Sequence, residues 1–124
     1  MINLDYICAK IGQNLIVKAD ENIFRKALGI LQEDGVYAMF LWLENKDNEI
    51  RKKLNSLLNE KEITSKLLSD SKSFPDDFEG FCEKLQEVAK DIDKLLFLKK
   101  ILERTLTYAL YHAKIKEEKN VDKN

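Results

Sequence analysis

The sequence predicts an all-α protein, a compact single-domain bundle of about five to six helices with a long C-terminal helix. Apolar residues recur at spacings of three and four through most of the chain, which is the period of amphipathic helices. Residues that start and stop helices separate these stretches, and no hairpin signal is visible. The 124 residues, 44% of them hydrophobic, can build one core but not two. We expect one helical domain over residues 1–119 and a frayed tail over 120–124.

The first two predicted helices are marked by apolar stripes and by terminal residues. Gly12, inside the stripe of residues 3–18, suggests that this helix packs closely against another. The second helix begins after Asp20, a candidate N-cap, and ends at Gly35, a candidate left-handed C-cap. The two stripes consist of Leu4, Ile7, Cys8, Ile11 and Leu15, and of Phe24, Ala27, Leu28 and Leu31.

The segment 36–43 contains no polar side chain. A helix that is apolar on every side normally lies at the centre of a bundle, so we expect this segment, with Trp42, to be the heart of the core. A strand is the alternative for such a short apolar run, but no partner strand is evident nearby.

The next helix should be capped by Asn48 and should continue past Asn59, as one kinked helix or as two short ones. Residues 69–75 hold three serines and the only proline, so they form the one convincing loop and divide the chain into two halves. The inward positions of this region are Ile50, Leu54, Leu57, Leu58, Ile63, Leu67 and Leu68.

After this loop the apolar residues alternate steps of four and three, which is typical of helices packed at a shallow angle. The stripe then drifts to a second set of positions, which predicts a long helix that ends at about Glu117. Whether residues 76–117 form one helix or two, broken near Asp91, stays open. The first set is Phe78, Cys82, Leu85, Ala89, Ile92 and Leu96, and the second is Leu98, Leu102, Leu106, Ala109 and Ala113.

Opposite charges nearly cancel in this chain. Its 21 Lys and Arg residues are balanced by 22 Asp and Glu residues, so the net charge of −1 creates no overall attraction for a polyanion. Contacts with nucleic acid must therefore be local, through basic clusters that meet phosphate oxygens without reading sequence. The candidate clusters are Arg25 with Lys26, and Arg51 with Lys52 and Lys53. Such short runs are also common on solvated helix surfaces.

The sequence offers little material for catalysis. His112 is the only histidine, Cys8 and Cys82 form no C-x-x-C pair, and no glycine-rich phosphate loop is present. We therefore expect a protein that is not an enzyme and has no metal or cofactor, with both cysteines reduced in the core. The N-terminus lacks the order of a signal peptide and no apolar run is long enough to span a bilayer, which predicts a cytoplasmic protein.

The best enzymatic candidate is Arg104 with His112, because small helical ribonucleases of the HEPN superfamily place an arginine shortly before a histidine. Eight residues of helix give about 80° of rotation and about 12 Å of rise, so these two side chains do not easily converge on one phosphate. The simpler interpretation is that His112 lies at the edge of the core stripe and Arg104 on the solvated side.

The predicted C-terminal helix carries a second face, nearly opposite its buried stripe. Its Arg and Tyr residues, flanked by Phe97 and Ile115, are typical of protein contacts and of base-stacking surfaces. The alternative is that a long helix simply packs on both sides inside the domain. The residues that we select as a candidate protein interface are Lys100, Arg104, Tyr108 and Tyr111.

The stretch Ile30–Lys46, ILQEDGVYAMFLWLENK, resembles the small subunit of type III-B (Cmr) CRISPR effector complexes, in which a helix end and a glycine precede an apolar helix closing on lysine. That family also ends in a long helix rich in Leu, aromatics, Ala and Lys, which residues 95–114 resemble through Leu-Thr-Tyr-Ala-Leu-Tyr-His-Ala-Lys.

The resemblance implies a non-catalytic structural subunit of a crRNA-guided complex in antiviral defence. Such a subunit would stack with copies of itself and with backbone subunits along the target RNA path. Its partners would be those subunits, crRNA and target RNA, through non-specific backbone contacts, with no membrane and no small-molecule substrate. A generic helical adaptor protein is the alternative that needs no RNA.

Overall fold

The computed structural model describes residues 3–15, 21–68 and 73–122, with side chains as far as Lys116. Within these residues the regular structure is entirely helical, which confirms the predicted all-α class and the long C-terminal helix. Seven helices are present in the described ranges: α1 (Leu4–Leu15), α2 (Glu21–Asp34), α3 (Val36–Lys46), α4 (Asn48–Leu58), α5 (Lys61–Leu67), α6 (Phe78–Ala89) and α7 (Ile92–Asp122).

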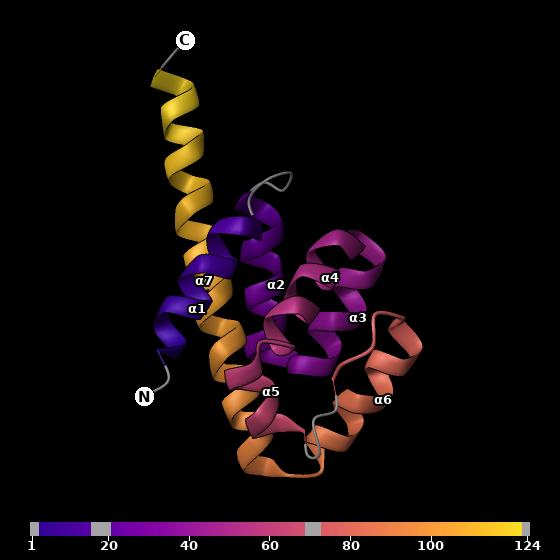
Figure 1. The fold of residues 1–124 in the computed structure, drawn as a ribbon. Helices are drawn as coiled ribbons and strands as arrows, with labels where there is room; N and C mark the ends of the chain where they lie inside the picture. The colour runs from indigo at the N-terminus through magenta and orange to yellow at the C-terminus, as the bar shows by residue number, and fades with distance from the viewer. Residues whose placement is uncertain (1–2, 16–20, 69–72, 123–124) are drawn as a thin grey trace.

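Helix α7 is the element on which the bundle is built (Figure 1). Helices α1 and α2 pack along it, and α5 and α6 contact it closer to its start, while α3 and α4 complete the bundle on the other side. The C-terminal turns of α7 extend beyond all the other helices. Along the described chain, no helix is both long enough and apolar enough to cross a membrane.

The close packing predicted at Gly12 lies between α1 and α7. A Cβ atom added to Gly12 would lie 2.8 Å from the carbonyl oxygen of Thr105 and 2.9 Å from Cβ of Tyr108, so only glycine fits without a shift. One turn earlier, the buried Cys8 thiol donates to the carbonyl oxygen of Ile101 at 3.6 Å. These contacts bring the backbones of α1 and α7 directly together.

The predicted helix stop at Gly35 is confirmed. Its φ of 103° lies in the region that favours glycine, and its N–H donates to the carbonyl oxygens of Ile30 and Leu31 at 3.1 and 3.2 Å. Helix α3 begins at the next residue, so α2 and α3 form a tight corner. The proposed N-cap of α2, Asp20, lies outside the described residues, as do residues 69–72 of the predicted loop.

The expectation that all of segment 36–43 lies at the centre of the core is wrong. Tyr37 and Leu41 are exposed and Trp42 is only partly buried, because the outer side of α3 faces solvent. Phe40, in contrast, is fully buried and packs edge-on against Phe81 of α6, with ring centroids 4.8 Å apart. The other buried residues of α3 are Val36, Met39 and Leu43.

Helices α4 and α5 are separate, which settles the choice between one kinked helix and two short ones. Asn59, after which the pattern was expected to continue, is the C-cap of α4. The N-cap of α4 is Asp47 rather than Asn48, because its side chain accepts from the N–H of Ile50 at 3.3 Å.

The chain breaks between α6 and α7, at Lys90 and Asp91. The Asp91 carboxylate accepts from the N–H groups of Asp93 and Lys94 and so starts α7. The prediction that the buried stripe from Phe78 continues through Ile92 and Leu96 is wrong, because this turn directs both side chains into solvent. Ala89, the last residue of α6, is also exposed.

The second apolar set is confirmed as the buried side of α7. The helix itself continues to Asp122, past the predicted end at Glu117 and into the tail that was expected to fray; residues 123 and 124 are outside the described chain. The buried residues of this set are Leu98, Leu102, Leu106, Ala109 and Ala113.

A pair of substitutions in α3 tests which aromatic residue supports the core. Phe40→Ala removes a fully buried ring and should lower the free energy of unfolding by about 3–5 kcal/mol. Trp42→Ala should lower it by only about 1–2 kcal/mol, because the ring is partly solvated. Chemical denaturation measures both values, and an equal loss in the two variants would contradict this assignment of the core.

Candidate interaction surface

The predicted second face of α7 forms a shallow surface depression of about 350 Å³. Lys100 and Tyr111 are exposed, and Arg104 and Tyr108 are partly exposed. The face therefore remains accessible even though α7 is packed in the bundle. The depression is lined by Lys100, Glu103, Arg104, Thr107 and Tyr108.

Asp5, in the first turn of α1, reaches this face. Its Oδ1 atom accepts a hydrogen bond from the Tyr108 hydroxyl at 2.5 Å and lies 3.9 Å from Nε of Arg104. Arg104 and Tyr108 thus take part in the packing of α1 on α7, as the doubly packed alternative proposed. Lys100 and Tyr111 take no part in it, so the face is shared between internal packing and open surface. No pattern in the sequence points to Asp5, because it is distant in the chain from α7.

The hydrogen bond to Asp5 raises the pKa of the Tyr108 hydroxyl, because the bond favours the protonated phenol; partial desolvation and the negative charge of Asp5 act in the same direction. Burial likewise raises the pKa of the Cys8 thiol, which disfavours a thiolate between α1 and α7.

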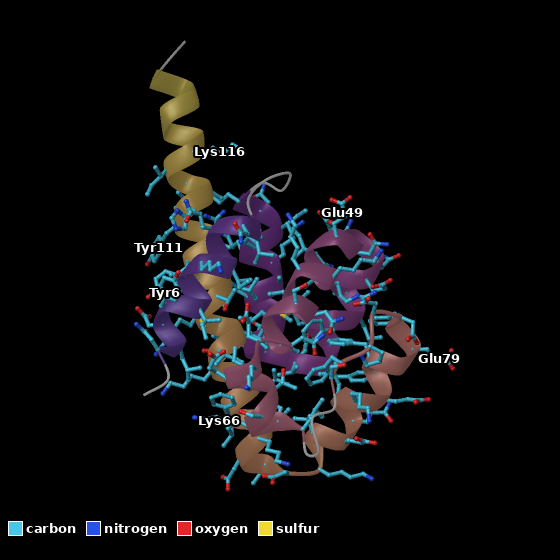
Figure 2. The ribbon with its side chains drawn as sticks, in the orientation of Figure 1. Tyr6, Glu49, Lys66, Glu79, Tyr111 and Lys116 are labelled. Atoms are coloured by element: carbon cyan, nitrogen blue, oxygen red, sulfur yellow. The ribbon has the colours of Figure 1, made fainter. Side chains whose placement is uncertain are left out.

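Aromatic side chains also lie on this edge of the molecule. Tyr6 of α1 and Tyr111 of α7 are 62% and 57% exposed, and Figure 2 shows both at the same edge. The Lys114 ammonium lies 5.9 Å from the centroid of the Tyr111 ring. Large exposed tyrosine rings, one of them beside a cation, are typical of contacts with proteins or nucleic acids.

Arg51 is not available to nucleic acid, and the prediction that it contacts an RNA backbone is wrong. Its side chain is only 2% exposed, and Nε lies 2.6 Å from Oε2 of Glu44. The guanidinium also lies over the rings of Phe78 and Phe81, 5.3 and 5.6 Å from their centroids. Arg51 is turned inward because it shares the face of α4 that contacts α6 and the preceding segment.

The other proposed RNA contacts are at the surface. Lys26 and Lys52 are exposed, and Arg25 is exposed but bonded to Glu21 of the same helix. Lys53 is partly buried and donates to the carbonyl oxygen of Asn14 at 3.1 Å. These side chains stand on two different helices, α2 and α4, so the structure divides them into two separate pairs.

A row of polar side chains on α4 and its C-cap, which was not predicted from the sequence, holds the segment before α6. Arg51 Nη1 donates to the carbonyl oxygen of Asp76 at 3.1 Å, Asn55 to that of Pro75 at 3.0 Å, and Asn59 to that of Phe74 at 2.9 Å. Asn59 also accepts from the N–H of Phe74 at 2.7 Å. The signal for this row was its spacing of four residues, which places all three side chains on one helix face.

Among the described residues, no group of three or more His, Cys, Asp or Glu side chains could hold a metal ion. No family model, no curated protein and no solved structure matches this chain. The assignment of the candidate interaction surface therefore rests only on the sequence and geometry of this chain.

Removing either of two neighbouring cations on α4 should change the stability of the protein by very different amounts. Arg51→Ala breaks a buried ion pair and three further contacts, and it should cost about 3 kcal/mol of stability. Lys52→Ala removes an exposed side chain and should change stability by less than about 0.5 kcal/mol. Thermal melts compare the two, and equal midpoints would mean that Arg51 is free to reach outward.

The hydrogen bond between Asp5 and Tyr108 should be detectable by titration. Since it raises the pKa of the folded phenol, its contribution to stability is fully present below the pKa of an unfolded tyrosine and is lost as the pH rises through the folded pKa. Asp5→Asn should therefore lower the Tyr108 pKa, measured by NMR with ring-labelled tyrosine. Glu33→Gln, on the exposed side of α2, should leave it unchanged. An identical Tyr108 titration in Asp5→Asn would contradict the bond.

Proposed function

We propose that this chain is a non-catalytic structural subunit of a crRNA-guided type III-B CRISPR ribonucleoprotein complex, and that it joins the complex through the open face of α7. The observation that carries the proposal is the combination of the exposed Lys100 and Tyr111 with the partly exposed Arg104, along one helix that also extends beyond the bundle. Arg and Tyr are the residue types that dominate binding energy at protein interfaces.

The resemblance of residues 30–46 to the Cmr small subunit supports the choice of complex. In that stretch Gly35 makes the corner between α2 and α3, and the apolar residues that follow form α3. The second resembling stretch, residues 106–114, lies on α7 and contains Tyr108 and Tyr111 of the proposed docking face.

Contacts with the RNA backbone are proposed for the other four basic residues, of which Lys53 is partly buried. They are Arg25 and Lys26 on α2, and Lys52 and Lys53 on α4. Such side chains would neutralise phosphates without reading bases, so the contacts should weaken as salt rises. The near-zero net charge is consistent with RNA held mainly by other subunits.

The ribonuclease alternative fits the geometry less well. Helix α7 is continuous between Arg104 and His112, so eight residues separate them by about 12 Å along the axis. Arg104 is also directed toward Asp5, on the α1 side of α7. A helical adaptor without RNA accounts for the same open face and differs from the proposal only in its partners.

Co-purification of the tagged chain from its native cells tests the proposal. The parent should bring down other effector subunits and crRNA, identified by mass spectrometry and RNA sequencing. An Arg104→Ala, Tyr111→Ala variant should associate about a thousandfold more weakly, because interface residues of these types contribute about 2 kcal/mol each. Its melting point should remain close to that of the parent, since Tyr111 is exposed and Arg104 meets α1 only through Asp5, at 3.9 Å.

A matched control is Lys46→Ala, Tyr37→Ala, which removes one cation and one tyrosine from the exposed side of α3. It should co-purify like the parent. Partners without any guide RNA would support the adaptor instead. Cleavage of labelled RNA by the pure protein, abolished by His112→Ala, would overturn the proposal in favour of the ribonuclease.

A further inference from the structure

The outer side of α3 is apolar although it faces solvent. Segment 36–43 contains no polar side chain, yet Tyr37 and Leu41, one turn apart, are 38% and 46% exposed. Ala38 and Trp42, each next in the chain to one of them, are partly buried. We call these four residues the α3 patch. A helix that only packs against a core carries polar residues on its outer side, so neighbouring apolar residues here are typical of a surface that another molecule covers.

Helix α6 forms one edge of the α3 patch. The Gln86 side-chain amide donates to the Tyr37 hydroxyl at 3.2 Å, which places these two exposed side chains against each other. Beneath them the ring of Phe40 packs on that of Phe81, with centroids 4.8 Å apart. The patch is therefore carried by two packed helices and not by a loop, and a partner that binds it loses little conformational freedom in ordering the surface.

The charges around the α3 patch are mostly acidic. Among the charged residues within four positions of Tyr37 or Gln86, those that are exposed are four acids and one lysine: Glu33, Asp34, Glu83, Glu87 and Lys90. Of these acids, only Glu87 has an ion-pair partner within the described chain, Lys84 at 3.5 Å. The wider region agrees, since residues 76–93 contain seven carboxylates and two lysines. The surroundings of the patch therefore carry a negative charge that the molecule itself does not neutralise.

This combination selects the chemistry of a partner. Tyr37 and Leu41 are four residues apart on one helix, so they form a short apolar row about 6 Å long. A second amphipathic helix packs onto such a row with apolar residues at the same spacing. Lysine or arginine residues beside its apolar side meet the carboxylates around the patch, whereas an acidic helix or a nucleic acid is repelled by them.

We infer that the α3 patch docks an amphipathic helix of another protein, one that carries lysine or arginine beside its apolar side. The patch is separate from the proposed docking face of α7, because α3 lies on the other side of the bundle from the C-terminal half of α7 (Figure 1). The inference therefore goes beyond the proposed function. It gives the chain a second surface, which stays open while the α7 face is occupied.

Binding of a synthetic peptide to the pure full-length protein tests the inference. The probe is an amphipathic helix of about four turns, with leucines on one side and lysines on both flanks of that side. Calorimetric titration of the parent should give saturable binding in the micromolar range. NMR spectra should show shifts at the Leu41 methyl groups and at the Gln86 side-chain amide. A second peptide with glutamates in place of the lysines should not bind, because it keeps the apolar side but meets carboxylates with carboxylates.

Two substitutions separate the apolar and the charged contributions. Leu41→Ser should weaken binding of the lysine peptide by about tenfold or more, because a central apolar contact is lost. Glu83→Lys should weaken it by about threefold or more and should reduce the salt dependence of the remaining binding. The matched controls are Leu96→Ser, at a similarly exposed leucine of α7, and Glu62→Lys, at an exposed glutamate of α5. Both should bind the peptide like the parent, and thermal melts should show that all four variants are folded.

Several outcomes would overturn the inference: a parent that does not bind the lysine peptide, a glutamate peptide that binds equally well, or an equal loss in Leu41→Ser and Leu96→Ser. Sedimentation of the pure parent tests the other occupant, since self-association that Leu41→Ser abolishes would assign the patch to a second copy and overturn the inference.

The fate of the proposed function is measured separately. Co-purification of effector subunits and crRNA depends on Arg104 and Tyr111, neither of which lies in the α3 patch, so Leu41→Ser should retain these partners. Their loss in Leu41→Ser would assign the patch to the complex itself and overturn the inference. Binding of the lysine peptide by a parent that brings down no effector subunits would support the inference and contradict the proposed function.

Discussion

The buried guanidinium of Arg51 is the junction on which the arrangement of one half of the molecule depends. It joins the Glu44 carboxylate of α3, the Asp76 carbonyl group before α6 and the rings of Phe78 and Phe81. A desolvated cation is tolerated only where partners of this kind surround it. Asn55 and Asn59 extend the same row along the segment. The direction in which α6 leaves this segment, and hence where its carboxylates point, follows from these contacts.

Much of the fold could be predicted because apolar periodicity reports burial directly. It located the buried side of α7, and Gly12 and Gly35 marked a close helix contact and a sharp corner through backbone properties that only glycine has. The pattern failed where an element faces two environments. The outer side of segment 36–43 faces solvent although its residues are apolar. The turn at Lys90 and Asp91 likewise places Ile92 and Leu96 in solvent.

The candidate surface could be predicted only in part, since a cation in a sequence gives no sign of which partner folding will bring. Arg51 belonged to a basic cluster in the sequence, yet its partners are 7 to 30 residues away along the chain. Lys52, its neighbour, points the other way because adjacent helix residues are about 100° apart. The four residues chosen on α7 do share one face, but Asp5, about one hundred residues earlier, occupies half of it.

Although the net charge of the chain is nearly zero, the fold separates its acidic and basic residues onto different surfaces. Because α6 and α7 are consecutive and joined by a turn of only Lys90 and Asp91, their opposite charges could have neutralised each other between adjacent helices. Instead, each helix turns its apolar side toward the core and its charged side outward, so that burial decides the direction of the charges. Salt screens electrostatic interactions in water beyond about 10 Å at 0.1 M, so charges at opposite edges act almost independently on an approaching molecule. A molecule of this kind attracts anions at one edge and cations at the other, and its total charge reports neither property.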